Sequence, residues 1–232
     1  MVMITTIPMT TRTAMADPTT SLRLMAWLSP AFPVGAFSYS HGLERAAGDG
    51  LVCNAGDLKD WLEVLLDHGT AWNDALLASQ AWQCATTDGD LCALAELGEA
   101  MAGSAERHLE TMAQGDAFAK YVAQWTAGRM LPDPCPYPVA FGASAGWAGL
   151  DRRATLAAFA QGFVTNQIQA GIRLSLLGQD AGVRLLHALE PNIVAMADRA
   201  ARASLDDLGS AALTAEIAAM NHETQHTRLF RS

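Results

Sequence analysis

The sequence is poor in charged residues and almost without lysine. Charged side chains make up 17% of its 232 residues, against about 25% in ordinary soluble domains, and the only lysines are Lys59 and Lys120. A P-loop needs a lysine directly after glycine, where the lysine and the backbone amides meet the nucleotide phosphates. Neither lysine follows a glycine, so the chain is not itself a P-loop GTPase or ATPase.

Basic residues are also scarce relative to acidic ones. The chain carries 15 Lys and Arg against 24 Asp and Glu, which gives a formal net charge of -9 and a pI near 5.0. A protein that binds nucleic acid needs a basic face for the phosphates, so this balance argues against a nucleic-acid partner. The few charges and the 50% of hydrophobic residues predict apolar surface that is covered by an oligomeric or obligate protein partner.

The cysteines show neither a CxxC pair nor the density of a disulfide-stabilised secreted domain. There are four of them, at Cys53, Cys84, Cys92 and Cys135. We therefore expect reduced thiols in a cytoplasmic protein.

No segment has the continuous apolar run of a signal peptide or of a membrane span. The first twenty residues are rich in threonine and interrupted by Pro8 and Pro18, so we predict that residues 1–20 form a disordered lead-in. Residues 154–172 are uncharged but contain several amide and hydroxyl side chains, which would cost free energy in hydrocarbon. We expect this stretch to be a buried helix, with no membrane contact.

Every strong apolar pattern in the chain has helical spacing. Leucine or tryptophan occupies positions 58, 61, 62, 65 and 66, which form one helix face, with Asp57 as the expected N-cap. No alternating strand pattern is present, and the many alanines favour helix. These patterns predict an all-α fold, with residues 21–232 forming a single compact domain of roughly eight to ten helices. The proline-rich segment 132–138 is expected to be an extended surface connection.

One short motif suggests zinc chemistry. His222, Glu223 and His226 spell H-E-x-x-H, in which two histidines on one helix face bind zinc and the glutamate activates water. A third ligand is also required, and an upstream residue such as His187 or Asp198 would have to supply it. The motif therefore has two interpretations. It is either the metal site of a zinc-dependent hydrolase or the solvated polar end of a helix without a chemical role.

A second motif, residues 38–42, resembles a nucleophile elbow with Ser40 as the nucleophile. That turn requires a strand before the serine, whereas Pro33 and Gly35 interrupt the chain here. We expect instead that Ser38 or Ser40 caps a helix.

The closing string HTRLFRS places Leu229 and Phe230 between Arg228 and Arg231. Such a group at an exposed end is typical of a docking element, in which phenylalanine fills a pocket and arginine makes bidentate contacts. Packing on the protein's own core would satisfy the aromatic side chain equally well, and both interpretations stay open.

Three long strings together resemble the urease accessory protein UreF family. They are LSPAFPVGAFSYSHGLE (residues 28–44), YPVAFGASAGWAGL (residues 137–150) and HETQHTRLFRS (residues 222–232). They occur in the order and at the spacing of that family, so the resemblance covers residues 22–232. It implies that H-E-x-x-H here belongs to a family signature in which the second histidine is not a fixed zinc ligand.

The resemblance implies an all-α homodimer without an active site, which acts in urease maturation in the cytoplasm. In that family the protein binds UreD, also called UreH, and the pair recruits the GTPase UreG to insert nickel into the urease apoprotein. No catalytic residue, metal ligand or tightly bound cofactor is implied, and nickel is expected only as transient cargo of the complex. A helical interaction domain unrelated to urease is a further alternative.

The resemblance also points to the residues that bind partners. Arg228, Leu229, Phe230 and Arg231 would become ordered on UreD and contribute to the surface that faces UreG. Two positions of the opening string, Tyr39 and Ser40, would lie near them.

Overall fold

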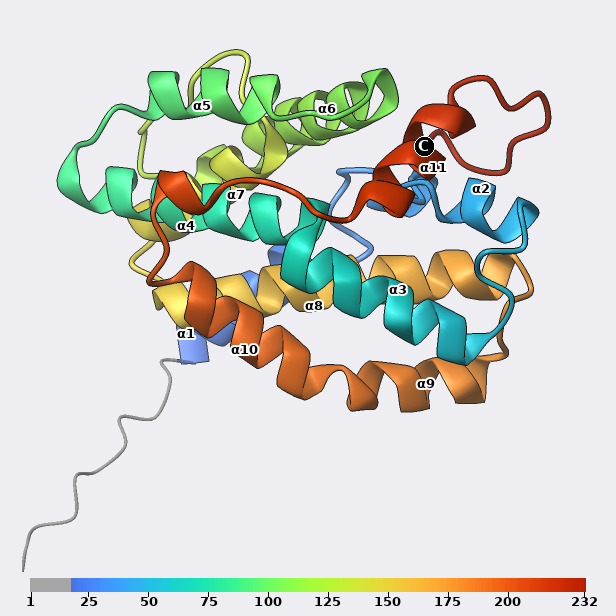
Figure 1. Ribbon diagram of the computed structural model, residues 1–232. Coiled ribbons are helices and arrows are strands. Elements are labelled where there is room, and N and C mark those ends of the chain that lie inside the picture. Colours follow the sequence, from blue (N-terminus) through green and yellow to red (C-terminus); the bar gives the residue numbers. More distant parts are fainter. Residues whose placement is uncertain (1–17) are drawn as a thin grey trace, which may run out of the picture.

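The computed structural model of the chain describes residues 18–232, and every regular element in that range is helical (Figure 1). Ten α-helices have ten or more residues, α2 has six, and three short 3-10 helices complete the set. The α-helices are α1 (Pro18–Trp27), α2 (Leu43–Gly48), α3 (Ala55–His68), α4 (Thr70–Thr87), α5 (Leu91–Ala100), α6 (Ala105–Val122), α7 (Tyr137–Trp147), α8 (Arg152–Arg173), α9 (Gln179–Ala188), α10 (Glu190–Ala200) and α11 (Leu213–His222). The 3-10 helices are η1 (Ala36–Ser38), η2 (Ala123–Trp125) and η3 (Leu205–Asp207). The prediction of a single all-α unit is confirmed.

The predicted lead-in, residues 1–20, lies mostly outside the described residues. Its last three residues, 18–20, form the first turn of α1. Pro18 suits the start of a helix, because the first turn needs no amide donor there and the fixed φ of proline favours helix.

Helix α4 lies at the centre of the fold, with α7 on one side and α10 on the other (Figure 1). Two buried apolar clusters meet on it, one formed with α3, α8 and α10 and the other with α1, α6 and α7. The adjacent leucines Leu76 and Leu77 belong to different clusters, as expected for a helix that is buried on more than one face.

The uncharged stretch 154–172 lies within α8, which contributes to both clusters. It is therefore a helix of the protein interior, as predicted. Among the helices of residues 18–232, α8 included, none combines the length and the apolar character that a membrane span requires.

Helices α4 and α7 approach so closely that glycine is needed between them. A Cβ atom on Gly142 would lie 2.0 Å from the carbonyl oxygen of Ala78, and one on Gly146 would lie 2.7 Å from the carbonyl oxygen of Trp82. Both distances are shorter than a van der Waals contact, so the small residues of α7 set the spacing of the two helices.

The predicted N-cap of α3 is wrong by three residues. Asn54 caps the helix, because its Oδ1 accepts the amides of Gly56 and Asp57. Asp57 faces back along the chain and accepts the amide of Cys53 over 2.8 Å. Asn54 thus satisfies two free amides of the helix end, whereas Asp57 binds the amide before the cap, a distinction that the apolar spacing alone does not reveal.

The proline-rich segment 132–138 is irregular only as far as Pro136, because Tyr137 and Pro138 form the start of α7. The predicted extended surface connection is therefore wrong for these two residues, and the residues just before the helix are buried. Cys135 and Pro136 are both covered by the protein, and burial raises the pKa of the Cys135 thiol to about 12. A Cβ atom on Gly115 of α6 would lie only 1.9 Å from the Cys135 carbonyl oxygen. The segment fits into a space that this glycine leaves open, which the proline pattern does not reveal.

Replacement of Gly142 by alanine should destabilise the protein, because the new methyl group would force α4 and α7 apart. We expect Gly142→Ala to lower the free energy of unfolding by about 2–3 kcal/mol or more. Gly48→Ala is the matched control, because nothing lies within 4 Å of its Cβ position, and it should change stability by less than about 1 kcal/mol. Chemical denaturation of both variants measures the difference, and equal stabilities would contradict the packing argument.

Candidate partner-binding site

The C-terminal segment (residues 223–232) folds back onto the loop before α2. The Arg231 amide donates to the Ser38 carbonyl over 2.8 Å, and the Ser40 amide donates to the Ser232 carbonyl over 2.7 Å. The Ser40 hydroxyl donates to the same carbonyl. In Figure 1 the segment leaves α11, turns outward and returns toward α11 and α2. The C-terminal segment and the loop before α2 therefore build one site.

Glu44, in the first turn of α2, binds this segment through its side chain. Its Oε1 accepts the Leu229 amide over 2.7 Å, and its Oε2 accepts the Phe230 amide over 2.9 Å. Hydrogen bonds to an ionised group are about twice as strong as neutral ones. The Nε2 of His222, the last residue of α11, lies 3.1 Å from the same Oε2. Glu44 thus joins α2, α11 and the C-terminal segment.

Phe230 anchors the segment in the protein's own core. Its side chain is only 4% exposed and packs with the cluster around α3, α4 and α8. The guanidinium carbon of Arg173 lies 4.1 Å from the centroid of its ring, within the range of a cation–π contact. Leu229, by contrast, is 53% exposed. Packing therefore applies to Phe230, while Leu229 remains available for docking.

The structure brings all six predicted partner-binding residues into this one region. Tyr39, Ser40 and Phe230 are buried, whereas Arg228, Leu229 and Arg231 are exposed. In this conformation the buried three contact the chain itself. Arg228 is exposed but pairs with Glu106, and Leu229 and Arg231 are exposed as well. Their role in binding a partner stays a prediction.

The H-E-x-x-H motif does not form the geometry of a zinc site. Helix α11 ends at His222, so His226 lies beyond the helix and does not share a face with it. His222 is fully buried, and Glu223 accepts the Ala105 amide at the start of α6 over 2.8 Å. The predicted solvated helix end is therefore wrong for His222, because the side chain is enclosed by acidic residues of α2 and α6.

The upstream third ligands considered for zinc are engaged elsewhere. His187 pairs with Glu190 over 3.3 Å, and Asp198 pairs with Arg153. Within residues 18–232, no three or more His, Cys, Asp and Glu side chains gather as a metal site would require. The zinc-hydrolase alternative thus has no assembled ligand set.

The nucleophile-elbow motif is likewise used for structure. Ser40 is buried, and besides its bond to Ser232 it accepts the Glu44 amide of the first turn of α2 over 3.3 Å. The N-cap of α2 is Gly42 and that of η1 is Gly35, neither with a side-chain cap, so the predicted cap at Ser38 or Ser40 is wrong. His41 and Gly42 follow with positive φ values of 52° and 78°. A Cβ atom on Gly42 would lie 2.7 Å from the Ala219 amide nitrogen, so this turn fits closely against α11.

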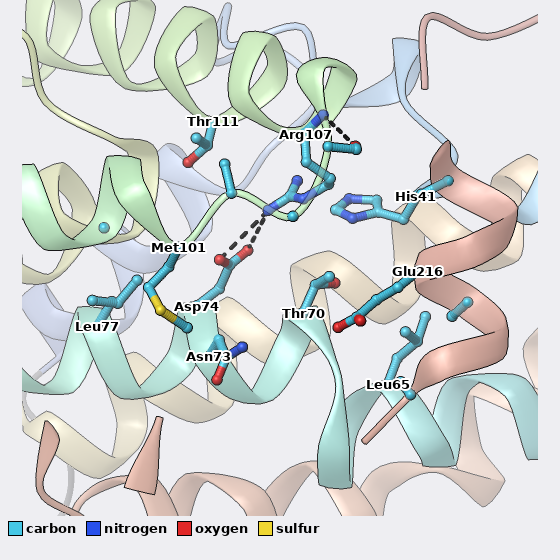
Figure 2. Close-up of a pocket in the computed structure, with 17 residues that line it drawn as sticks. His41, Leu65, Thr70, Asn73, Asp74, Leu77, Met101, Arg107, Thr111 and Glu216 are labelled. Atoms are coloured by element: carbon cyan, nitrogen blue, oxygen red, sulfur yellow. Dashed lines mark hydrogen bonds and ion pairs between the residues drawn. The ribbon is translucent and has the colours of Figure 1, made fainter. Parts of the chain in front are cut away.

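A second group of buried charges lies beside the C-terminal segment. Figure 2 shows the Arg107 side chain reaching from α6 toward Asp74 of α4, with His41 beside it. Arg107 lies 3.1 Å from Asp74 and 2.7 Å from Glu110, and His41 lies 3.0 Å from Glu110. Arg107, Asp74 and His41 border a cavity of about 60 Å³ between α4, α6 and α11. The Ser232 hydroxyl also reaches Glu110, over 3.3 Å, which links this group to the C-terminal segment.

The protonation of this group follows from burial and from its ion pairs. Burial by itself would raise the pKa of Glu110, but the positive charge of Arg107 and the contact with His41 outweigh it and lower the pKa to about 2. Burial raises the pKa of Asp74, because the attraction of Arg107 and His41 compensates only part of it and the charge of Glu110 opposes them. The carboxylates of Glu110 and Asp74 in turn raise the pKa of Arg107 despite its burial.

Sequence reasoning missed most of the residues that hold the site together. Glu44 is the last residue of the string 28–44, but the sequence does not indicate which backbone amides its side chain binds. Glu106 and Glu110 lie on α6 and Arg173 at the end of α8, in parts of the chain without a motif. Only their three-dimensional neighbours reveal a role, because each contacts residues far away in the sequence.

The fold and this site define an all-helical protein whose C-terminal segment is bound to the loop before α2, with exposed apolar and basic residues presented from it. The UreF family model matches residues 52–190, more than half of the chain. Over 219 residues the chain is 56% identical to urease accessory protein UreF 1 of Brucella canis, which covers 93% of this chain and 96% of that protein. It is 53% identical over 213 residues to urease accessory protein UreF of Mesorhizobium japonicum, and this alignment covers 91% of this chain and 96% of that protein. The chain belongs to the UreF family.

Substitutions at the two adjacent apolar positions should separate packing from exposure. We expect Phe230→Ala to lower the free energy of unfolding by about 2–4 kcal/mol, because it removes a buried ring. Leu229→Ala should change stability by less than about 0.5 kcal/mol, because its side chain is largely in solvent. Thermal and chemical denaturation measure both values, and a Phe230→Ala variant as stable as the wild type would show that the segment is not anchored in solution.

Acid should destabilise the protein partly through Glu110. A folded-state pKa of about 2 against an ordinary value of 4.5 means stability that is present above about pH 4.5 and lost as the pH falls toward 2. Glu110→Gln should lower the free energy of unfolding at neutral pH by about 3 kcal/mol and reduce the loss between pH 5 and pH 3. Glu99→Gln, which removes a surface partner of His108, is the control and should keep the wild-type slope. Equal slopes in all three proteins would contradict the assignment.

Proposed function

We propose that the protein is a non-catalytic scaffold for urease maturation, which binds UreD (UreH) and so recruits the UreG GTPase for nickel insertion into the urease apoprotein. The observation that carries the proposal is the arrangement of the C-terminal segment. Phe230 anchors it in the core, and Leu229 and Arg231 are exposed on either side of that anchor. An apolar side chain flanked by arginines on a fixed backbone suits protein recognition, because little ordering entropy is lost on binding.

A stripe of exposed apolar side chains on α11 supports the proposal that partners bind at the C-terminal segment. Leu213, Ile217 and Met220 are 64%, 53% and 46% exposed, and their spacing of four and three residues places them on one helix face. An unpartnered stripe of this kind on the helix that leads into the C-terminal segment fits an interface with a protein such as UreD.

The two motifs that suggested catalysis support a non-catalytic role. His222 contacts carboxylates through both ring nitrogens, and the Ser40 hydroxyl donates to the Ser232 carbonyl. Neither group is presented to a substrate in this arrangement. The chain then needs no cofactor of its own, and nickel is cargo of the assembled complex.

A homodimer in the cytoplasm completes the proposal. The shortage of charge leaves apolar area to be covered, and the structure has a hollow of about 930 Å³ between the segment 24–37 and helices α6 and α8. Its lining is mostly apolar, which favours burial against another protein surface.

Complementation tests this function directly. In cells whose own UreF gene is deleted, with cognate UreD and UreG present, the wild-type chain should restore nickel-dependent urease activity. A Leu229→Ala/Arg231→Ala double variant should keep its melting temperature but bind tagged UreD at least about tenfold more weakly and restore less activity. Val183→Ala, which alters an exposed apolar side chain on α9, is the matched control and should behave as wild type. No restoration by soluble wild-type protein would refute the proposal.

A further inference from the structure

The cavity between α4, α6 and α11 combines apolar walls with two carboxylates. Asp74 of α4 and Glu216 of α11 are the acids that line it. Its apolar walls are formed by Leu65, Leu77, Met101, Ala212, Ala215 and Ala219. The volume of about 60 Å³ is several times the roughly 10–15 Å³ that one water molecule needs. The cavity therefore has room for a short aliphatic chain with a polar end.

Three of the side chains that line this cavity have polar atoms without a partner. His41 is only 9% exposed, and its Nδ1 forms no hydrogen bond. The Thr70 hydroxyl is buried and also unpaired. The Glu216 carboxylate has no hydrogen bond or ion pair with any of residues 18–232. Figure 2 shows it pointing from α11 toward Thr70 and His41. Buried polar atoms are rarely left unpaired, so this arrangement points to a ligand that pairs with them.

Negative charge exceeds positive charge around the cavity. Arg107 is shared between two carboxylates, because both Asp74 and Glu110 pair with it. Glu216 adds a third carboxylate, which pairs with no cation of the described residues. Counting His41, which contacts Glu110, as a second cation still leaves three acids against two bases. A ligand that carries a positive charge and hydrogen-bond donors would compensate the acids, whereas water would supply the donors alone.

The chemistry of the walls selects the kind of cation. In the part of the chain that the structure describes, the His, Cys, Asp and Glu side chains do not gather as a metal ion would require. An alkylammonium group matches the cavity, because its stem packs on apolar walls while its N–H donors meet carboxylate and hydroxyl oxygens. Lysine is the protein side chain of this type, and its ammonium group is more compact than the planar guanidinium of arginine.

Glu216 connects the cavity with the exposed apolar stripe of α11. It is three residues after Leu213 and four before Met220, so these side chains are neighbours on the helix surface. Glu216 itself is partly exposed, whereas Ala215 and Ala219 on either side of it are buried. A protein that covers the stripe therefore lies next to the acid that lines the cavity.

We propose that the cavity between α4, α6 and α11 binds a lysine side chain of the protein that docks on the α11 stripe, with the ammonium group at Glu216 and Asp74. The apolar walls hold the four-carbon stem, and the Thr70 hydroxyl is a further acceptor. Under the proposed function the docking protein is UreD. The identity of the partner, but not the chemistry of the cavity, rests on that function.

Titration with n-butylammonium chloride, the free analogue of a lysine side chain, tests the cavity on the full chain. At constant ionic strength, the amide NMR signals of Thr70, Gly103 and Glu216 should shift and saturate with a Kd of about 1–10 mM, as for one small group. n-Butanol has the same stem without the charge and should bind at least about tenfold more weakly. Equal binding of the two probes, or no saturable shift at the cavity, would overturn the proposal. This comparison needs no variant.

A charge-matched pair of variants locates the binding. Glu216→Gln should weaken n-butylammonium binding at least about tenfold, because it removes the unpaired carboxylate. Its melting temperature should stay near that of the wild type, since no intramolecular contact of the carboxylate is lost. Glu190→Gln removes an acid of α10 that lies outside the cavity and should bind n-butylammonium like the wild type. Full binding by Glu216→Gln, or equal losses in both variants, would show that the amine does not bind at this site.

Binding of tagged UreD decides whether a partner's lysine is the occupant. Glu216→Gln should weaken this binding at least about fivefold, and Glu190→Gln should leave it unchanged. If n-butylammonium binds but Glu216→Gln binds UreD like the wild type, the assignment to a lysine of UreD is overturned and the cavity takes a free amine. If the wild-type chain does not bind UreD at all, the proposed function fails, while the titrations still decide whether the cavity binds an alkylammonium group.

Discussion

The candidate site depends on the hydrogen bonds of the Glu44 carboxylate. This carboxylate accepts two backbone amides of the C-terminal segment while it faces His222 of α11. A buried carboxylate is stable only where donors and positive charge compensate it, so the three elements have to be in place together. The exposed side chains of the segment are therefore presented from a defined backbone.

The neighbouring charges of α6 extend this constraint into the protein. Glu106 and Glu110 lie one helical turn apart; Glu106 pairs with His222 and Arg228, and Glu110 with Arg107 and His41. Buried ion pairs of this kind add little net stability compared with apolar packing, but breaking one leaves an uncompensated charge. These ion pairs mainly determine the arrangement of the C-terminal segment. The fold itself is held together by the packing of α4 against its neighbours.

Helical periodicity was sufficient to predict the fold class, because the spacing of Leu58, Leu62 and Leu65 depends only on local geometry. The family strings also placed the candidate site, since they contain Tyr39, Ser40 and the four residues of the closing group. The burial of Cys135 and the roles of Glu44 and Glu106 could not be predicted. Each depends on contacts between distant segments, and a glutamate in a helix usually lies in solvent.

The closing group RLFR shows why packing and docking are not true alternatives. A short segment that docks only through its own side chains would have to lose its conformational freedom on binding. In this conformation Phe230 and the Glu44 contacts fix the backbone, and Leu229 and Arg231 are exposed from it. The same anchoring makes the presentation of those side chains depend on groups that never reach the surface. Removal of the Glu44 carboxylate can therefore alter a binding surface whose exposed side chains are those of Leu229 and Arg231.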